Sequence, residues 1–254
     1  MAYTAYDWQQ TLAEKADYAE SRLRHGAPVV ALSYDKGILL LTFRKNQGKI
    51  FEVYDRLAMG AMGNPSDLEA VRQYAVDFSH SEGYQRSIED VSVQRVVGFA
   101  ISPSFKTAFS DPRRMPVVLN SIFTQVGETP EDDMIFVLNY DGEFHRHEGH
   151  AHISGNKDAN ARMHEVLHDA KAGNQKSAIE LALKAWAAGQ WKPKDHSSED
   201  EDKILLPTKD EREKLFKKQL DDGARIEAAV LERDTQRERR YQVLDKETLA
   251  PFLP

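Results

Sequence analysis

The sequence contains no cysteine among its 254 residues. This absence excludes disulfide bonds, a thiol nucleophile and metal sites built from thiolates. No apolar run approaches the ~20 residues that a membrane helix needs. Met1 to Thr4 have no basic stretch leading into an apolar one, so we expect no signal peptide. Together these absences predict a cytoplasmic protein with no membrane partner.

Several motifs of nucleotide and serine chemistry are also missing. The chain has no P-loop, no glycine-rich dinucleotide motif and no G-x-S-x-G sequence. Its formal net charge of −7 argues against general nucleic-acid binding. We therefore expect no bound cofactor and no nucleic-acid partner. The composition, 41% hydrophobic and 30% charged, is ordinary for a globular protein.

What the sequence does contain is short apolar runs in pairs, separated by turn residues. Val29 to Leu32 and Ile38 to Leu41 flank Asp35-Lys36-Gly37, and Asp141-Gly142 lies between two later runs. An Asp and Gly turn between two β-rich runs predicts a hairpin. The expected strands span residues 29–32, 38–41, 49–53, 57–62, 134–140, 143–147, 150–153, 224–231 and 241–244.

Helical periodicity fills the segments around these strands. In residues 7–24, apolar side chains from Trp8 to Leu23 recur every three or four positions, which predicts one buried stripe. Asp7 is placed to cap this helix. Further helices are expected over residues 66–80, 89–109, 159–172, 177–188 and 246–252.

Two of these helices have clear boundary signals. Ser66 and Glu69 fit the capping-box pattern S-x-x-E, so we expect Ser66 to cap the second helix. Gly83 is expected to end that helix. Pro103 falls inside the next periodic segment, where a proline should kink or divide a helix.

The strands are grouped in hairpins and do not alternate singly with helices. This order favours antiparallel sheets, and the simplest closure is two sheets face to face with helices on both outer sides. We expect a single α+β domain over residues 1–254. The charged segment 190–223 is expected to be a disordered insertion, with room for a helix at Lys209 to Leu220.

The order of the pieces resembles the proteasome subunit family, within the Ntn-hydrolase superfamily. It is most similar to the α-type subunits of bacterial 20S proteasomes. The segments that carry the resemblance are VVALSYDKGILLL, GKIFEVYDRLAMGAMGNPSDLEAVRQYAVDF, SEGYQRSIEDVSVQRVV, FVLNYDGEF, KSAIELALKAWAAG and ARIEAAVLERDTQRERRYQVLDKETLAPFL. The resemblance implies a four-layer α-β-β-α sandwich. It also matches the first helix to one that α-type subunits carry and β-type subunits lack.

The resemblance further implies a subunit without catalytic residues. Active members start their first strand with a processed threonine, whose hydroxyl attacks the substrate and whose amine serves as base. The matching place here is Gly26-Ala27-Pro28, which has no hydroxyl. The lysine of the family's active site falls near Arg44, and a guanidinium is too basic to transfer protons well.

Other roles follow from the same resemblance. The chain is expected to form a heptameric ring, to dock a ring of catalytic β subunits and to gate the axial pore with a flexible tail of residues 1–7. Tyr6 and Asp7 match the gate by position. Lys49 matches the lysine that binds the C-terminal carboxylate of an AAA+ ATPase activator, a contact between opposite charges.

Two alternatives remain open at this level. The first is a zinc metallohydrolase, because His164-Glu165-Val166-Leu167-His168 fits H-E-x-x-H, with Glu180 available as a third ligand. A cluster of four further histidines, at positions 145, 147, 150 and 152, could also converge on a metal. The second alternative is an assembly protein that keeps the proteasome fold in a different ring. The favoured interpretation assigns no metal.

Overall fold

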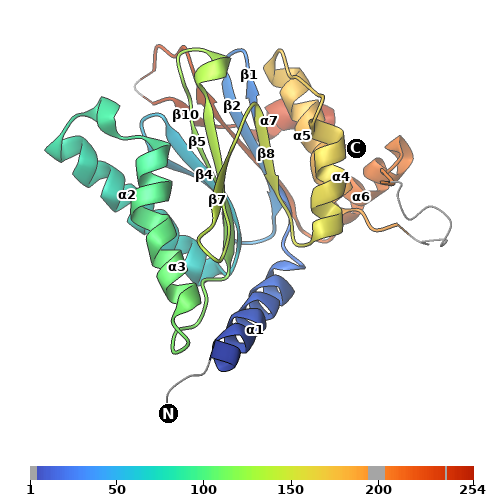
Figure 1. Ribbon diagram of the computed structural model, residues 1–254. Helices are drawn as coiled ribbons and strands as arrows, with labels where there is room; N and C mark the ends of the chain where they lie inside the picture. Colours follow the sequence, from blue (N-terminus) through green and yellow to red (C-terminus); the bar gives the residue numbers. More distant parts are fainter. Residues whose placement is uncertain (1–4, 194–203, 238) are drawn as a thin grey trace.

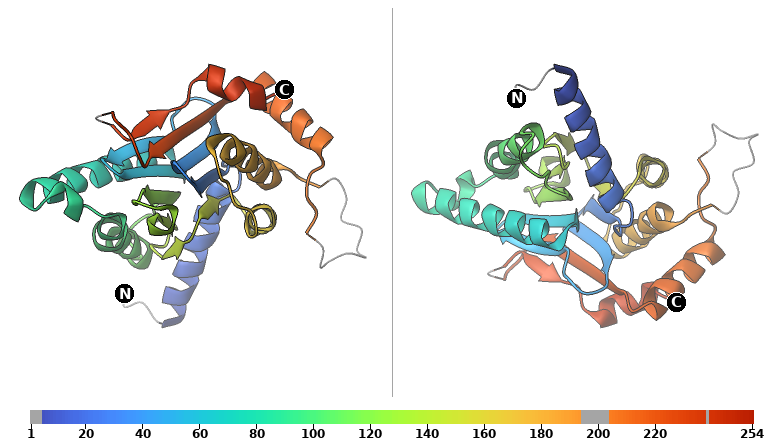
Figure 2. Two further views of the ribbon diagram at one scale, coloured as in Figure 1. Left: turned by 90° about the horizontal axis from the view of Figure 1, so that it is seen from above. Right: turned by 90° about the horizontal axis from the view of Figure 1, so that it is seen from below.

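The computed structural model describes residues 5–193, 204–237 and 239–254. Its core is two five-stranded antiparallel sheets packed face to face (Figure 1). The first sheet has the order β10-β9-β2-β1-β8, and the second has the order β3-β4-β5-β6-β7. Helices cover the outer face of each sheet (Figure 2), so the predicted four-layer sandwich is confirmed.

Each sheet gathers strands from distant parts of the chain. The first contains β1 (Val29–Tyr34), β2 (Gly37–Arg44), β8 (His150–Ile153), β9 (Arg225–Glu232) and β10 (Tyr241–Val243). The second contains β3 (Ile50–Tyr54), β4 (Leu57–Gly63), β5 (Leu119–Gln125), β6 (Met134–Leu138) and β7 (Phe144–His147). The helices are α1 (Ala5–Leu23), α2 (Pro65–Gln85), α3 (Ser102–Ser110), α4 (Lys157–Leu167), α5 (Gln175–Gln190), α6 (Lys209–Asp221) and α7 (Lys246–Leu249).

The first hairpin is apolar on both faces because both of its faces are covered. Successive side chains of a strand point to opposite sides. Val29 and Ala31 therefore lie in the cluster between the sheets, while Val30 and Leu32 face the outer helices. The outer cluster centres on Trp186 of α5, whose ring lies 4.2 Å from that of Phe43 between centroids. This double burial explains the continuous apolar runs in the sequence.

The α2 helix begins and ends differently from the sequence expectation. Asn64, and not Ser66, is the N-cap: its side-chain oxygen accepts the backbone N–H of Ser66 at 3.3 Å. Glu69 instead accepts from Arg72, so the predicted capping box is wrong. The helix also runs through Gly83 to Gln85. A Cβ at Gly83 would clash with the Tyr54 hydroxyl, so this glycine serves packing and does not end the helix.

Pro103 does divide its segment, as predicted. A π-helical turn, η2 (Arg95–Ile101), gives way to α3 at Ser102, with Pro103 in the first turn of α3. Proline is tolerated there because its missing N–H would have no partner in a first turn. Three short 3₁₀ turns lie at η1 (Ile88–Asp90), η3 (Pro130–Asp132) and η4 (Ala250–Phe252).

The end of the charged segment 190–223 is ordered. Residues 194–203 lie outside the described residues, but the end of the segment forms α6. Phe216 of α6 is buried and stacks on Phe43, with ring centroids 5.9 Å apart. That part of the segment belongs to the hydrophobic core. Among the described residues, no helix is long and apolar enough to cross a membrane.

Candidate functional site

Polar side chains hold the backbone at the point where the chain enters the first sheet. Residues 24–28 join α1 to β1. The Lys49 Nζ donates a hydrogen bond to the Ala27 carbonyl at 3.3 Å. The Thr42 hydroxyl donates to the Pro28 carbonyl at 2.6 Å. Two side chains thus fix the backbone at the position matched to a catalytic threonine.

Glu227 on β9 holds Lys49 from the other side. Its carboxylate accepts the backbone N–H of Lys49 at 3.0 and 3.2 Å and that of Ile50 at 3.4 Å. The Arg44 Nε lies 3.6 Å from the same carboxylate. Burial lowers the pKa of Lys49 to about 8, and the Glu227 charge opposes this shift. Burial raises the pKa of Glu227, against the hydrogen bonds and cations around it.

Lys49, and not Arg44, is the cation beside the start of β1. Arg44 instead faces the Glu227 carboxylate, and its Nη1 donates to the Asn46 carbonyl at 2.9 Å. An ammonium whose pKa is about 8 is largely charged at neutral pH, so Lys49 can bind a carboxylate there. No hydroxyl belongs to residues 26–28.

The two expected gate residues lie inside a helix. Tyr6 and Asp7 belong to the first turns of α1, which starts two residues earlier than expected. Residues 1–4 of the predicted tail lie outside the described residues. The N-terminal half of α1 projects from the body of the molecule (Figures 1 and 2). Trp8 on this half is 39% exposed, so the predicted stripe is buried only toward its C-terminal end, at Ala19 and Leu23.

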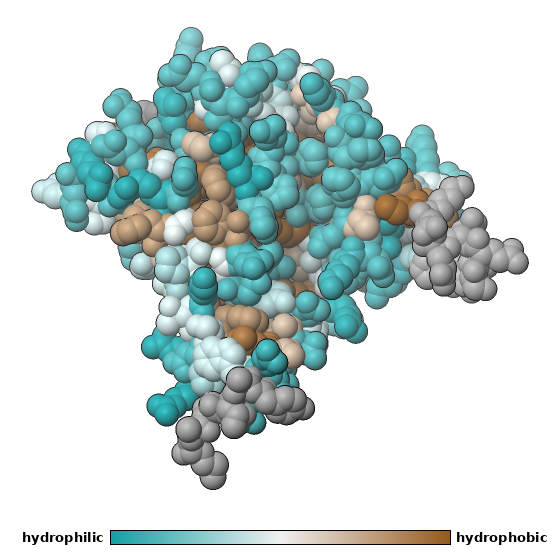
Figure 3. Space-filling model, viewed as in Figure 1, coloured by the Kyte–Doolittle hydropathy of each residue, from teal (hydrophilic) through white to brown (hydrophobic). Residues whose placement is uncertain are grey.

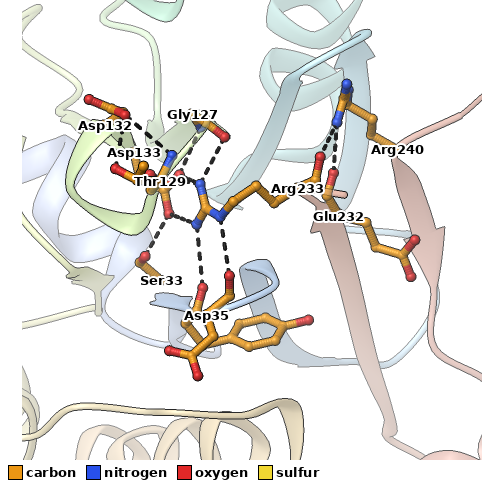
Figure 4. Close-up of polar contacts among 10 residues, drawn as sticks. Ser33, Asp35, Gly127, Thr129, Asp132, Asp133, Glu232, Arg233 and Arg240 are labelled. Atoms are coloured by element: carbon orange, nitrogen blue, oxygen red, sulfur yellow. Dashed lines mark hydrogen bonds and ion pairs between the residues drawn. The ribbon is translucent and has the colours of Figure 1, made fainter. Parts of the chain in front are cut away.

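Among the described residues, the most buried ion pair is one that no sequence pattern indicated. Arg233 and Asp133 form two parallel bonds of 2.8 and 2.9 Å, with side chains only 4% and 0% exposed (Figure 4). The guanidinium also donates to the carbonyls of Gly127 and Thr129. The Ser33 hydroxyl donates to Asp133 at 2.5 Å. The pair therefore joins the end of β9, β1 and the loop before β6. Asp133 lies 100 positions from Arg233 and 100 positions from Ser33.

The H-E-x-x-H motif lies on the exposed side of α4. The rings of His164 and His168 are 5.5 Å apart, but the ring nitrogens of His168 face other groups. Its Nδ1 lies 3.1 Å from the Glu165 carbonyl, and its Nε2 lies 2.9 Å from Asp169. Glu180 lies on α5, in a groove with α6 and the C-terminus. Within the described residues, no group of three or more His, Asp or Glu side chains is placed to hold a metal.

Three histidines, His147 on β7 and His150 and His152 on β8, are largely uncharged at neutral pH. Burial lowers the pKa of His147, His150 and His152, and neighbouring histidines add to each shift. His152 has a pKa of about 4. Its Nε2 lies 3.1 Å from the Asn160 carbonyl, while its Nδ1 is buried without a partner. These side chains act as neutral packing groups at pH 7.

Apolar side chains are exposed over the layer of α2, η1 and η2 (Figure 3). We call the surface that carries Tyr74, Tyr84, Ile88 and Phe99 the aromatic patch. Phe99 is 70% exposed and Tyr84 is 93% exposed. The Arg95 guanidinium lies 5.7 Å from the centre of the Phe99 ring. The residues of this patch lie on elements that pack against one another, and exposed apolar side chains on one layer are typical of an interface.

Comparison with known proteins places the chain among proteasome subunits. The profile of the family described as proteasome subunit matches residues 23–201. A proteasome subunit alpha from Xylanimonas cellulosilytica is 32% identical over 149 residues, which cover 58% of this chain and 60% of that protein. One from Actinosynnema mirum is 27% identical over 247 residues, covering 96% of this chain and 85% of that protein. One from Thermomonospora curvata is 30% identical over 153 residues, covering 59% and 66%.

Proposed function

The chain belongs to the proteasome subunit family, and on this premise we propose that it is the noncatalytic α-type subunit of a bacterial 20S core particle. The observation that carries the proposal is the continuous path from α1 into β1. Ala27 stands where a catalytic threonine would be free, and its nitrogen is bonded to Gly26. Residues 26–28 offer no hydroxyl nucleophile and no free α-amine at that point.

We propose that copies of this chain form a head-to-tail ring, expected to be heptameric. The projecting half of α1 supports this role because its apolar side chains, Trp8 and Leu12, are not buried within the subunit. A neighbouring copy would cover them. The deletion of residues 2–7 tests the gate proposed for Tyr6 and Asp7: basal peptide entry into the assembled particle should rise. Unchanged entry would remove the gate from the proposal.

The aromatic patch is the proposed docking surface for the ring of catalytic β subunits. It presents Phe99 and Tyr84 on helices that already cover one face of the sandwich. Burying such side chains between rings contributes about 25 cal/mol per Å² of apolar surface. The assembled particle would degrade proteins through the threonines of the β ring. We place it in the cytoplasm.

Lys49 is the proposed contact for the C-terminal carboxylate of an ATPase activator. Its ammonium is held beside Ala27 in a partly dry environment, where opposite charges attract more strongly than in water. Lys49→Ala should abolish the stimulation of peptide hydrolysis by the ATPase and leave basal hydrolysis unchanged. Lys45→Ala, an exposed lysine in the loop before Lys49, is the control.

The native mass of the purified chain tests the whole proposal. We expect a ring-sized species, or co-assembly into a barrel when a β subunit from the same source is added. Peptidase activity of that barrel should depend on the partner's threonine. A stable monomer or dimer that ignores the β subunit would leave a proteasome fold with another function.

A further inference from the structure

The Glu227 carboxylate binds the backbone of Lys49 and does not pair with its ammonium. Its two oxygens accept from the Lys49 and Ile50 N–H groups and face the Arg44 guanidinium. A carboxylate has about four acceptor sites, and these contacts occupy most of them. The Lys49 Nζ meanwhile donates to a neutral carbonyl, that of Ala27. Two further donors of the ammonium remain for a ligand.

We propose that Glu227 is the positioning residue for carboxylate recognition by Lys49. It fixes the start of β3 through two backbone hydrogen bonds and keeps a negative charge near the ammonium without neutralising it by contact. This inference rests on the proposed role of Lys49 and adds a second residue, from the far end of the chain, to the same site. Glu227 and Lys49 are 178 positions apart.

The backbone around Lys49 is held from two strands, by Glu227 of β9 and Tyr241 of β10, so its geometry is fixed. Arg44 of β2 faces the Glu227 carboxylate. The Tyr241 hydroxyl donates to the Ile50 carbonyl at 3.2 Å. A site held this firmly loses little conformational entropy when a ligand binds.

The same arrangement makes carboxylate binding depend on pH. The titratable groups around Lys49 are Glu227, Arg44, Glu52 and Tyr241, and of these Glu227 is the one that raises the Lys49 pKa. Burial has already lowered that pKa to about 8. Without the Glu227 charge it must fall further, so the ammonium would be lost at a lower pH.

The test uses the assembled particle and Glu227→Gln. Glutamine keeps an oxygen that accepts the backbone N–H groups but removes the charge. Glu52→Gln, on the same strand as Ile50, is the matched control. The probe is a synthetic peptide of the last ten residues of the ATPase used for reconstitution, as free acid and as C-terminal amide. Its affinity is measured from pH 6.5 to 9. In parallel, competitive acetylation of Lys49 followed by mass spectrometry gives the Lys49 pKa without any ligand.

We expect the free acid to bind wild type with a midpoint near pH 8, and Glu227→Gln with a lower midpoint. A shift of one unit would weaken binding about fivefold at pH 8 and little at pH 6.5. Glu52→Gln should match wild type, and the amide should bind weakly to all three. A Glu227→Gln particle whose binding and acetylation both titrate as in wild type overturns the proposal. If Lys49→Ala binds the free acid as wild type does, the activator role itself fails, while the acetylation titration still tests the coupling of Glu227 to Lys49.

Discussion

Replacing Asp133 should destabilise the subunit strongly. Its carboxylate is fully buried against Arg233. Asp133→Asn leaves the guanidinium buried without a counter-charge, which typically costs about 3–5 kcal/mol. Urea unfolding of the purified chain should show this loss. Asp234→Asn, an exposed neighbour of Arg233, should change the free energy of unfolding by less than about 0.5 kcal/mol. A loss below about 1 kcal/mol for Asp133→Asn would contradict the argument.

His152 should make the fold sensitive to acid. Its folded pKa is about 4, below the usual 6.5 of a histidine, because it is buried. The unfolded chain therefore binds more protons between these values, and stability falls as the pH drops from 6.5 toward 4. The expected loss from this one group is on the order of 3 kcal/mol.

His152→Gln should remove that part of the acid sensitivity. Thermal unfolding at pH 7 and pH 4.5 measures the difference between wild type and variant. His147 and His150 have pKa values lowered in the same direction, so the variant should keep some sensitivity. The exposed His25 supplies the control, His25→Gln. Equal losses in wild type and in His152→Gln would show that another group controls the acid response.

At the scale of elements, one lysine attaches α1 to the body. The Lys15 Nζ donates to the carbonyls of Ala108 and Phe109 at 3.1 Å and to that of Asp111 at 2.5 Å. These carbonyls lie at the end of α3, where a cation is favoured by the helix dipole. The bonds fix the direction in which α1 leaves the sandwich.

Lys15→Met keeps most of the apolar stem of the side chain but removes all three bonds. Hydrogen bonds to a charged group contribute about 1.5–3 kcal/mol. Amide hydrogen exchange in α1 and in the last turn of α3 should therefore become roughly tenfold faster or more. Lys45→Met, at an exposed lysine, should leave the exchange of both helices unchanged. Unchanged exchange in Lys15→Met would mean that apolar packing alone holds α1.

The sequence predicted the elements better than their ends. Hairpins could be predicted because apolar runs and Asp-Gly turns are local signals. The start of α2 was misassigned because Ser66 and Glu69 matched a pattern, although Pro65 directly follows the true cap, Asn64. The end of α2 was misassigned because the reason for Gly83, the approach of Tyr54, comes from another layer.

Contacts between distant parts of the chain limited the prediction of the site even more than that of the helix ends. Lys49 was identified from the resemblance, but its partners Ala27 and Glu227 come from other strands of the folded molecule. The pair of Asp133 and Arg233 has no sequence pattern at all, because its members meet only after both sheets have formed. Local periodicity carries no information about such distant contacts.

At the scale of the whole molecule, a variant in the aromatic patch tests the proposed docking of this chain to β subunits. Phe99→Asp places a charge where we propose an apolar contact with the β ring, so rings of this chain should form but fail to join β subunits. Native mass and peptidase activity after mixing measure both steps. Met115→Asp, also at a strongly exposed apolar residue, should assemble normally. Barrels of Phe99→Asp in normal yield would assign the β ring to another surface.

The unbroken connection between α1 and β1 also limits how this chain could change over evolutionary time. The substitution Ala27→Thr would place a hydroxyl near Lys49, but the backbone nitrogen of the new threonine would stay in the peptide bond to Gly26. A free amine would appear only if α1 were cut away. The new threonine and the loss of α1 are useful only together. The loss of α1 also removes Lys15 from the end of α3. Selection would therefore oppose each intermediate between this chain and one with a free N-terminal threonine.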